Sequence, residues 1–165
     1  MIAVRLNLRD LAPGERLRAP FDERITLQLD GQTAEAEARG EVEVFQTGQG
    51  VVLQGRVEAD VPLVCSRCLL SFHETVRVRL DEEFSLRPPE LADGELGPQD
   101  FISWIGPEQQ LDVGEVVRQH MQIAIPMAPV HRADCRGLCS VCGANWNERS
   151  CEHQLQLEAR QSRRE

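Results

Sequence analysis

The side chains of this sequence that could do chemistry are six cysteines in two clusters, with histidines beside them. Cys65 and Cys68 form an isolated Cys-x-x-Cys pair, and Cys139 and Cys142 form a second. A tight two-residue turn brings both thiolates to one side, where they can grip a tetrahedral ion that two further Cys or His ligands complete. The spacing therefore predicts structural Zn²⁺, as one or two ions.

Two partitions of the ligands fit four-coordinate zinc. In the first, two ions use all eight candidates, and the sets are Cys65, Cys68, His131 and Cys135, and Cys139, Cys142, Cys151 and His153. In the second, one ion takes either the four C-terminal cysteines or the two Cys-x-x-Cys pairs, and the other groups are bystanders. The C-terminal set is the stronger pattern because its ligands are contiguous, and Gly143 suits a turn that needs positive φ.

Disulfide chemistry and catalysis are the competing uses of these residues. The first ten residues carry arginine within a short apolar stretch and lack the apolar region of a signal peptide, so we expect a cytoplasmic protein with reduced thiols. The sequence contains no His-Glu-x-x-His and no phosphate-cradling glycine loop, and no nucleophile stands beside a matched base motif. We therefore expect no enzymatic activity and no small-molecule substrate.

Size and charge restrict the class of protein further. A chain of 165 residues has room for one domain with a small stapled appendage. The net charge of −9 disfavours general attraction to nucleic acid. Every cation is arginine, whose planar fork suits phosphate, although genomic base composition is the simpler explanation. No apolar run approaches the ~20 residues that a membrane span needs.

The elements that must position the cysteines follow from hydrophobic periodicity. Residues 24–30, 40–45 and 72–80 alternate apolar and polar side chains, and glycine turns separate the strands, which is typical of an antiparallel sheet with one solvated face. Cys65 and Cys68 lie between two such strands, so we expect them at a hairpin tip. This turn would already point both thiols to one side.

The clearest helix is expected over residues 112–125. Asp112 can cap it, Glu115 would complete a capping box, and Pro126 ends the apolar stripe. His120 on that stripe is interpreted as a packing residue. The predicted class is α+β: a mainly antiparallel sheet or small open barrel, one packed helix, and a C-terminal zinc-stapled segment.

The predicted organisation has three parts. Residues 1–130 form a β-rich domain closed by the helix, residues 131–153 form the cysteine-rich segment, and residues 154–165 form a polar tail. Within the first part, residues 82–108 contain several Pro and Gly breaks and are rich in acid. They are interpreted as a solvated connection, with a protein-docking strip as the alternative.

The order of motifs resembles a known family. The matching segments are Val61-Pro-Leu-Val-Cys65-Ser-Arg-Cys68-Leu69, Asp81-Glu-Glu-Phe84, Leu111-Asp-Val-Gly-Glu-Val-Val-Arg118, Ile125-Pro-Met127 and Cys135-Arg-Gly-Leu-Cys139-Ser-Val-Cys142-Gly-Ala-Asn-Trp-Asn147. In this order they resemble the large ribosomal RNA subunit accumulation protein family, also called YceD, of bacteria and plastids. The longer form of that family commonly ends in Cys-x-Cys, where this chain has His153 at the second position.

The resemblance implies a role in the accumulation of large-subunit (23S) ribosomal RNA, and hence in ribosome assembly, without enzymatic activity. An acidic protein is better suited to basic ribosomal proteins or assembly factors than to RNA, although ribosomal RNA is a further candidate partner. The alternative function is a thiol redox or zinc-sensing protein that uses Cys65 and Cys68. Redox pairs need a depressed thiol pKa, for which Arg67 is the nearby cation.

Overall fold

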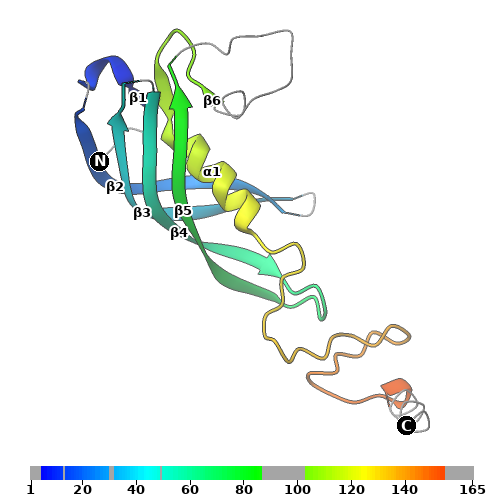
Figure 1. The fold of residues 1–165 in the computed structure, drawn as a ribbon. Helices are drawn as coiled ribbons and strands as arrows, with labels where there is room; N and C mark the ends of the chain where they lie inside the picture. The colour runs from blue at the N-terminus through cyan, green and yellow to red at the C-terminus, as the bar shows by residue number, and fades with distance from the viewer. Residues whose placement is uncertain (1–4, 13, 30–31, 49, 87–102, 155–165) are drawn as a thin grey trace, which may run out of the picture. The chain divides into compact units, whose positions relative to one another are not determined.

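A computed structural model describes residues 5–12, 14–29, 32–48, 50–86 and 103–154 (Figure 1). Its main sheet has the strand order β2-β3-β4-β5-β6. The strands are β2 (Arg16–Leu29), β3 (Gln32–Gln46), β4 (Gly50–Val64), β5 (Ser71–Ser85) and β6 (Ser103–Trp104). β3 is antiparallel to both β2 and β4, whereas β6 runs parallel to β5. The sheet is open rather than closed into a barrel, which confirms the predicted α+β class.

Alternation along the strands explains why these residues form a half-buried sheet. In β4 the buried positions include Val57, Ala59 and Val61, and the residues between them, Glu58 and Asp60, are exposed on the other side. Every second side chain of a strand points to the same face, so one face becomes apolar and the other charged. The apolar face is the core of the sheet.

The main α-helix covers residues Val113–Ala124 and is labelled α1 (Figure 1). The side chain of Asp112 accepts a hydrogen bond of 2.9 Å from the Glu115 backbone N–H, so the predicted cap is present. The Glu115 carboxylate, however, accepts two hydrogen bonds of 2.7 Å from Arg118, one on each oxygen. The carboxylate is engaged along the helix, so the capping box is only half formed. Val113, Val117 and Met121 are fully buried.

A small second sheet precedes this helix. β1 (Arg5–Asn7) pairs antiparallel with β7 (Gln110–Asp112), and a short 3-10 helix follows at Leu8–Asp10. No helix in the described part of the chain is long and apolar enough to cross a membrane.

The chain divides into two compact units. Unit 1 comprises residues 1–61 and 75–125, and unit 2 comprises residues 62–74 and 126–165. Unit 1 contains 21 of the 27 acidic residues and 11 of the 18 arginines, so its formal charge is −10, which leaves +1 for unit 2. The negative charge of the protein therefore belongs to unit 1. The three-part domain boundaries predicted above stay a prediction.

The interpretation of residues 82–108 as a connection is wrong for the first four residues of this segment. β5 continues to Ser85, so Glu82 and Glu83 are strand residues that point to opposite faces. Glu82 lies on the side of α1, and its Oε1 is 3.0 Å from His120 Nε2. His120 is half-buried and packs as expected. The acids Glu90, Asp93, Glu95 and Asp100 of this segment, and the tail from residue 155, lie outside the described residues.

Candidate metal centres

The first Cys-x-x-Cys turn closes the hairpin between β4 and β5, as predicted. The Cys65 backbone N–H donates to the Leu70 carbonyl, and the Leu69 N–H donates to the Cys65 carbonyl, both at 2.9 Å. Leu69 adopts a φ of 59°, which a leucine rarely does. These two bonds fold the turn around the positions of the Cys65 and Cys68 thiols.

The other two members of the first set come from the segment after α1. The Ser66 N–H donates to the Pro129 carbonyl at 2.8 Å, and the Leu138 N–H donates to the Arg67 carbonyl at 3.0 Å. Arg67 Nη1 also donates to the Cys135 carbonyl at 3.0 Å. These backbone bonds hold the segment against the turn, and so they bring the side chains of His131 and Cys135 to it.

Distances within this first set match a tetrahedral ion. Cys65 Sγ lies 3.8 Å from Cys135 Sγ, and Cys68 Sγ lies 3.4 Å from His131 Nδ1. Tetrahedral zinc with ordinary Zn–S and Zn–N bonds places two sulfurs about 3.8 Å apart, and a sulfur and a nitrogen about 3.5 Å apart. A disulfide would need the sulfurs about 2.05 Å apart. All six cysteines are free thiols.

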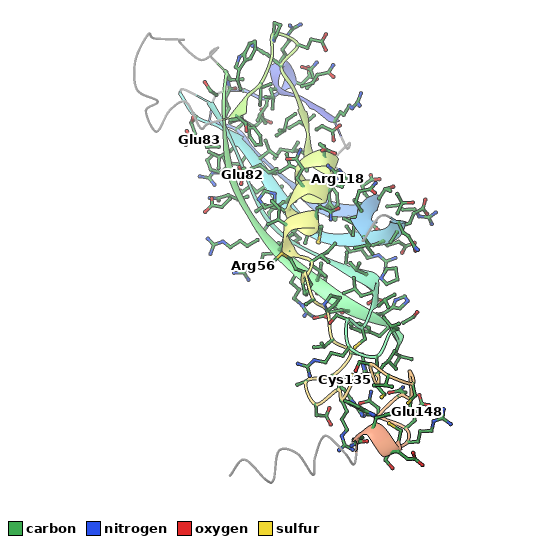
Figure 2. All side chains as sticks on the ribbon, turned by 90° about the vertical axis from the view of Figure 1, so that its right-hand side faces the viewer. Arg56, Glu82, Glu83, Arg118, Cys135 and Glu148 are labelled. Carbon is green, nitrogen blue, oxygen red and sulfur yellow. The ribbon has the colours of Figure 1, made fainter. Side chains whose placement is uncertain are left out.

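The surroundings of the first set are apolar. Cys65, Cys68 and Cys135 are buried, and Phe72, Val130 and Leu138 pack against them. The Phe72 ring meets the His131 ring edge-on, with centroids 6.4 Å apart. Cys135 can be located in Figure 2. The three thiols are therefore shielded from water and from chelators that would compete for a bound metal.

The second Cys-x-x-Cys turn repeats the first one bond for bond. The Cys139 N–H donates to the Ala144 carbonyl and the Gly143 N–H donates to the Cys139 carbonyl, both at 2.8 Å. Gly143 has a φ of 69°, as its place after Cys142 predicted. In both loops the residue four positions after the first cysteine has a positive φ. The first loop uses Leu69 there and the second uses glycine, a difference that sequence reasoning missed because leucine gives no hint of this conformation.

Cys151 and His153 complete the second set. The Trp146 indole Nε1 donates to Cys151 Sγ at 3.3 Å, which orients the thiol. His153 Nδ1 is buried and has no hydrogen-bond partner among the described residues. A buried imidazole nitrogen without a partner is costly in an ordinary core, whereas a metal ion would satisfy it. This orphaned nitrogen supports His153 as a candidate ligand of the second set.

A supporting polar residue was also missed. Asn147 Nδ2 donates to Cys135 Sγ at 3.4 Å, and Asn147 Oδ1 accepts from the Arg136 backbone N–H at 2.8 Å. Hydrogen bonds to a ligating sulfur orient it and tune its basicity. The only indication in the sequence was the polar Asn-Trp-Asn run between Cys142 and Cys151.

The thiol pKa values diverge within each set. Burial raises the pKa of Cys65, but hydrogen bonds from His131 and from the Cys68 and Arg67 backbone outweigh it and lower the value to about 5. Burial raises the pKa of Cys68, and Cys135 adds to that rise. In the second set the Trp146 hydrogen bond lowers the pKa of Cys151 to about 6.

Cys142 shows the opposite shift. The Ala144 backbone N–H lowers its pKa, yet Cys139, burial and Cys151 together raise it above the ordinary value. Crowded thiolates repel one another, so each proton lost makes the next harder to lose. A divalent cation removes that repulsion, and these shifts are therefore suited to metal binding.

The structure thus brings the eight predicted residues together in two sets. The sets are Cys65, Cys68, His131 and Cys135, and Cys139, Cys142, Cys151 and His153, and within each the potential ligand atoms lie within 4.8 Å of one another. Each set could hold a metal ion. Three thiolates and one imidazole fill a tetrahedral shell, which is typical of structural rather than catalytic sites. The ligand assignment itself stays a prediction.

Comparison with known proteins adds independent information. The family model described as large ribosomal RNA subunit accumulation protein YceD matches residues 53–163, which include all eight candidate ligands. An uncharacterized protein of Mycobacterium tuberculosis strain H37Rv is 30% identical over 120 residues, covering 73% of this chain and 56% of the relative. An uncharacterized protein of Mycobacterium leprae is 29% identical over 122 residues, covering 74% and 55%.

A plant protein also matches. The large ribosomal RNA subunit accumulation protein YCED homolog 1, chloroplastic, of Arabidopsis thaliana is 25% identical over 153 residues, covering 78% of this chain and 47% of the relative. The chain spans about half the length of the curated relatives it matches. No solved structure matches the chain significantly.

Proposed function

Because the chain belongs to the large ribosomal RNA subunit accumulation protein YceD family, we propose that it is a non-enzymatic ribosome-assembly factor that supports accumulation of 23S ribosomal RNA. The observation that carries this proposal is the family match over residues 53–163, which spans both metal-ligand sets. The role is exercised in the cytoplasm, where bacterial ribosomes assemble.

Two structural zinc ions belong to this proposal. Cys65, Cys68, His131 and Cys135 would hold one, and Cys139, Cys142, Cys151 and His153 the other. The Cys/His donor sets, the short sulfur–sulfur and sulfur–nitrogen distances and the orphaned His153 nitrogen support zinc. Zinc would supply no reaction here. It would fix the turns that present the surface of unit 2.

The proposed direct partners are basic large-subunit ribosomal proteins or assembly factors. Support comes from the charge of −10 on unit 1, which attracts a basic partner and repels the RNA backbone as a whole. Such attraction weakens with salt because exposed charges are screened. Glu83 is exposed and lies on an outward face, whereas Glu82 faces His120, so the two acids are not equivalent in binding. Both are labelled in Figure 2.

The test is the ribosome profile of cells that lack the protein. We expect large-subunit particles and 23S RNA to fall relative to small-subunit particles in a sucrose gradient, with recovery on re-expression. Co-sedimentation with large-subunit precursors at low and moderate salt then tests the partner, with Glu83→Gln as the charge variant and Glu82→Gln as its matched control. An unchanged subunit ratio after deletion would refute the proposal.

A thiol redox or zinc-sensing function is the second candidate, because the pKa of Cys65 is lowered to about 5. A thiolate at neutral pH is the reactive form. Against it, Cys65 and Cys68 are only 0% and 6% exposed. Mild peroxide treatment discriminates the two functions. Rapid formation of a Cys65–Cys68 disulfide in the zinc-loaded protein would favour the redox function, and resistance would favour the structural one.

A further inference from the structure

The sheet face opposite the apolar core of unit 1 carries a lattice of opposite charges. Arg18 pairs with Glu41 at 2.8 Å and Arg77 pairs with Glu58 at 3.0 Å. Three more arginines of this face form ion pairs. Arg16 pairs with Glu43, and Arg24 pairs with Glu35 and Glu37. Arg39 pairs with Asp22 and Glu37. Such cross-strand pairs are the ordinary way in which a solvated sheet face is stabilised.

Arg56 on β4 and Arg79 on β5 are the exceptions on this face. Both are exposed, and neither has a hydrogen-bond or ion-pair partner within the described ranges. Arg56 is labelled in Figure 2. Glu41 is its partner in the β3–β4 register, but that carboxylate is taken by Arg18. The two guanidinium groups are thus left with their donors unused by the described protein.

The neighbouring side chains show that Arg56 and Arg79 face each other. On one side Gln54 Nε2 donates to Asp81 Oδ1 at 2.9 Å, and on the other Arg77 Nε donates to Glu58 Oε2 at 3.0 Å. Arg56 stands midway between Gln54 and Glu58, and Arg79 stands midway between Asp81 and Arg77. The two are therefore directly opposite, an arrangement of like charges that destabilises a sheet.

A hollow of about 580 Å³ lies at this pair, bordered by four arginines and one carboxylate. The arginines are Arg39, Arg56, Arg77 and Arg79, and the carboxylate is Glu58. Both Arg56 and Arg79 also border an adjoining hollow of about 380 Å³. In a unit whose charge is −10, this is a local excess of positive charge with room for a ligand.

We propose that Arg56 and Arg79 form a clamp for one phosphate group, presented either by the backbone of single-stranded RNA or as free phosphate. The planar guanidinium matches phosphate oxygens in bidentate fashion, and an anion between two facing cations relieves their repulsion. The surrounding carboxylates are each engaged by an arginine, so they oppose the anion weakly. The clamp rests on the geometry of unit 1 and does not depend on the proposed function.

The test compares two double variants of the full chain that lose the same charge. Arg56→Gln/Arg79→Gln removes the clamp, and Arg16→Gln/Arg24→Gln removes two paired arginines of the same face. The probes are a labelled single-stranded RNA 12-mer, followed by fluorescence anisotropy, and inorganic phosphate, followed by the rise of Tm. We expect the clamp variant to lose at least about 10-fold in RNA affinity, or the whole phosphate-induced rise, and the control to change less than about 3-fold.

The two probes identify the source of the phosphate. A clamp-dependent response to RNA, with free phosphate competing only at much higher concentration, assigns RNA. Neutralising one phosphate of a single-stranded RNA also gives a log–log salt slope of about −0.7. A clamp-dependent response to inorganic phosphate alone assigns the free anion. Equal losses in both double variants, or no response of the wild type to either probe, would overturn the proposal.

Arg79→Glu separates binding from folding. It places a carboxylate opposite Arg56 and so exchanges a repulsive pair for an attractive one. We expect its Tm to equal or exceed that of the wild type while the response to RNA or phosphate disappears. Retention of the response by Arg79→Glu would contradict the clamp, and a loss cannot be attributed to unfolding when Tm is maintained.

Discussion

Unit 1 and unit 2 differ in the side chains that form their cores. Unit 1 buries a continuous set of aliphatic side chains, including Leu27, Leu53, Leu80 and Met121, each at 1% exposure or less. In the described part of unit 2, the buried apolar side chains are Leu63, Ala144 and the cysteines Cys65, Cys68, Cys135 and Cys139. Most of the core of unit 2 therefore consists of candidate metal ligands, and we expect its fold to depend on a bound metal.

The two Cys/His sets within unit 2 also differ from each other. Three ligands of the first set are buried, whereas Cys142 of the second is exposed and Cys151 and His153 are half-buried. The same backbone turn thus supports a shielded site and an accessible one. Accessibility to competing ligands, rather than turn geometry, is expected to set the order in which the ions are released.

Of the changes that separate the stability of unit 1 from that of unit 2, metal removal has the largest expected effect. A strong zinc chelator should unfold unit 2 and leave unit 1 folded, because metal-linked folding of such modules is worth on the order of 10 kcal/mol. Hydrogen exchange should show lost protection in residues 126–154 and unchanged protection in α1, with chelator preloaded with zinc as the control. The second set should lose its ion before the first. Simultaneous unfolding of both units would contradict the independence of unit 2.

Creating a cavity in the core of unit 1 tests the independence of the units from the other side. Leu53→Ala should lower the free energy of unfolding of unit 1 by about 2–5 kcal/mol, because Leu53 is fully buried. The zinc content should not change. Val141→Ala, at a side chain that is 70% exposed, is the control and should cost less than about 0.5 kcal/mol. Thermal unfolding and elemental analysis of both variants measure the two effects, and metal loss in Leu53→Ala would link the units.

The two equivalent turns allow a matched test of backbone strain. Leu69→Gly should raise the stability of unit 2 by up to about 1 kcal/mol, because a left-handed leucine costs about 1–2 kcal/mol and the entropy of glycine offsets part of the gain. Gly143→Leu should lower it by about 1–2 kcal/mol for the opposite reason. A Cβ at Gly143 would meet no atom within 4 Å, so the β-carbon adds no clash to the backbone strain. Equal effects of the same sign would show that the turns are not equivalent.

The Glu115–Arg118 pair of α1 gives the smallest expected effect, and one that is pH-dependent. Hydrogen bonds from Arg118 and then Gln119 lower the pKa of Glu115 from 4.5 to about 2. A lowered folded-state pKa means that the stabilisation is complete above pH 4.5 and disappears as the pH falls through about 2. The pair is partly exposed, so Glu115→Gln should cost about 0.5 kcal/mol or less at pH 7 and nothing once the pH is well below the folded-state pKa. Protection of α1 amides against hydrogen exchange measures it. A pH-independent cost would assign the effect to packing.

The elements of the fold that could be predicted from the sequence are those with a strong local periodicity. Alternation gave the strands of the sheet, and Asp112 with Pro126 marked the ends of α1. The same alternation that places Leu80 inward also places Glu82 inward, so its position beneath α1 was readable, but the acidic composition of residues 82–108 masked it. The partner of Glu82, His120, lies 38 residues away and could not be inferred from local sequence.

The candidate metal centres were also predictable from local sequence only in part, because long-range contacts complete them. The eight candidate ligands could be named from residue type and spacing, because thiol and imidazole chemistry is specific. Their partition between two sets required the backbone bonds that join residues 66–67 to residues 129 and 138, which are long-range contacts. The positive φ of Leu69 depends on the turn between β4 and β5, and the opposition of Arg56 to Arg79 depends on strand register. Composition reveals neither.

The central claim is that two metal ions replace an apolar core in unit 2, and native mass spectrometry of protein produced with zinc available tests it most directly. The expected result is two zinc ions per wild-type chain and one per chain in Cys142→Ser, with unit 1 folded in both. Fewer than two ions in the wild type, with residues 126–154 still protected from proteolysis, would contradict the claim.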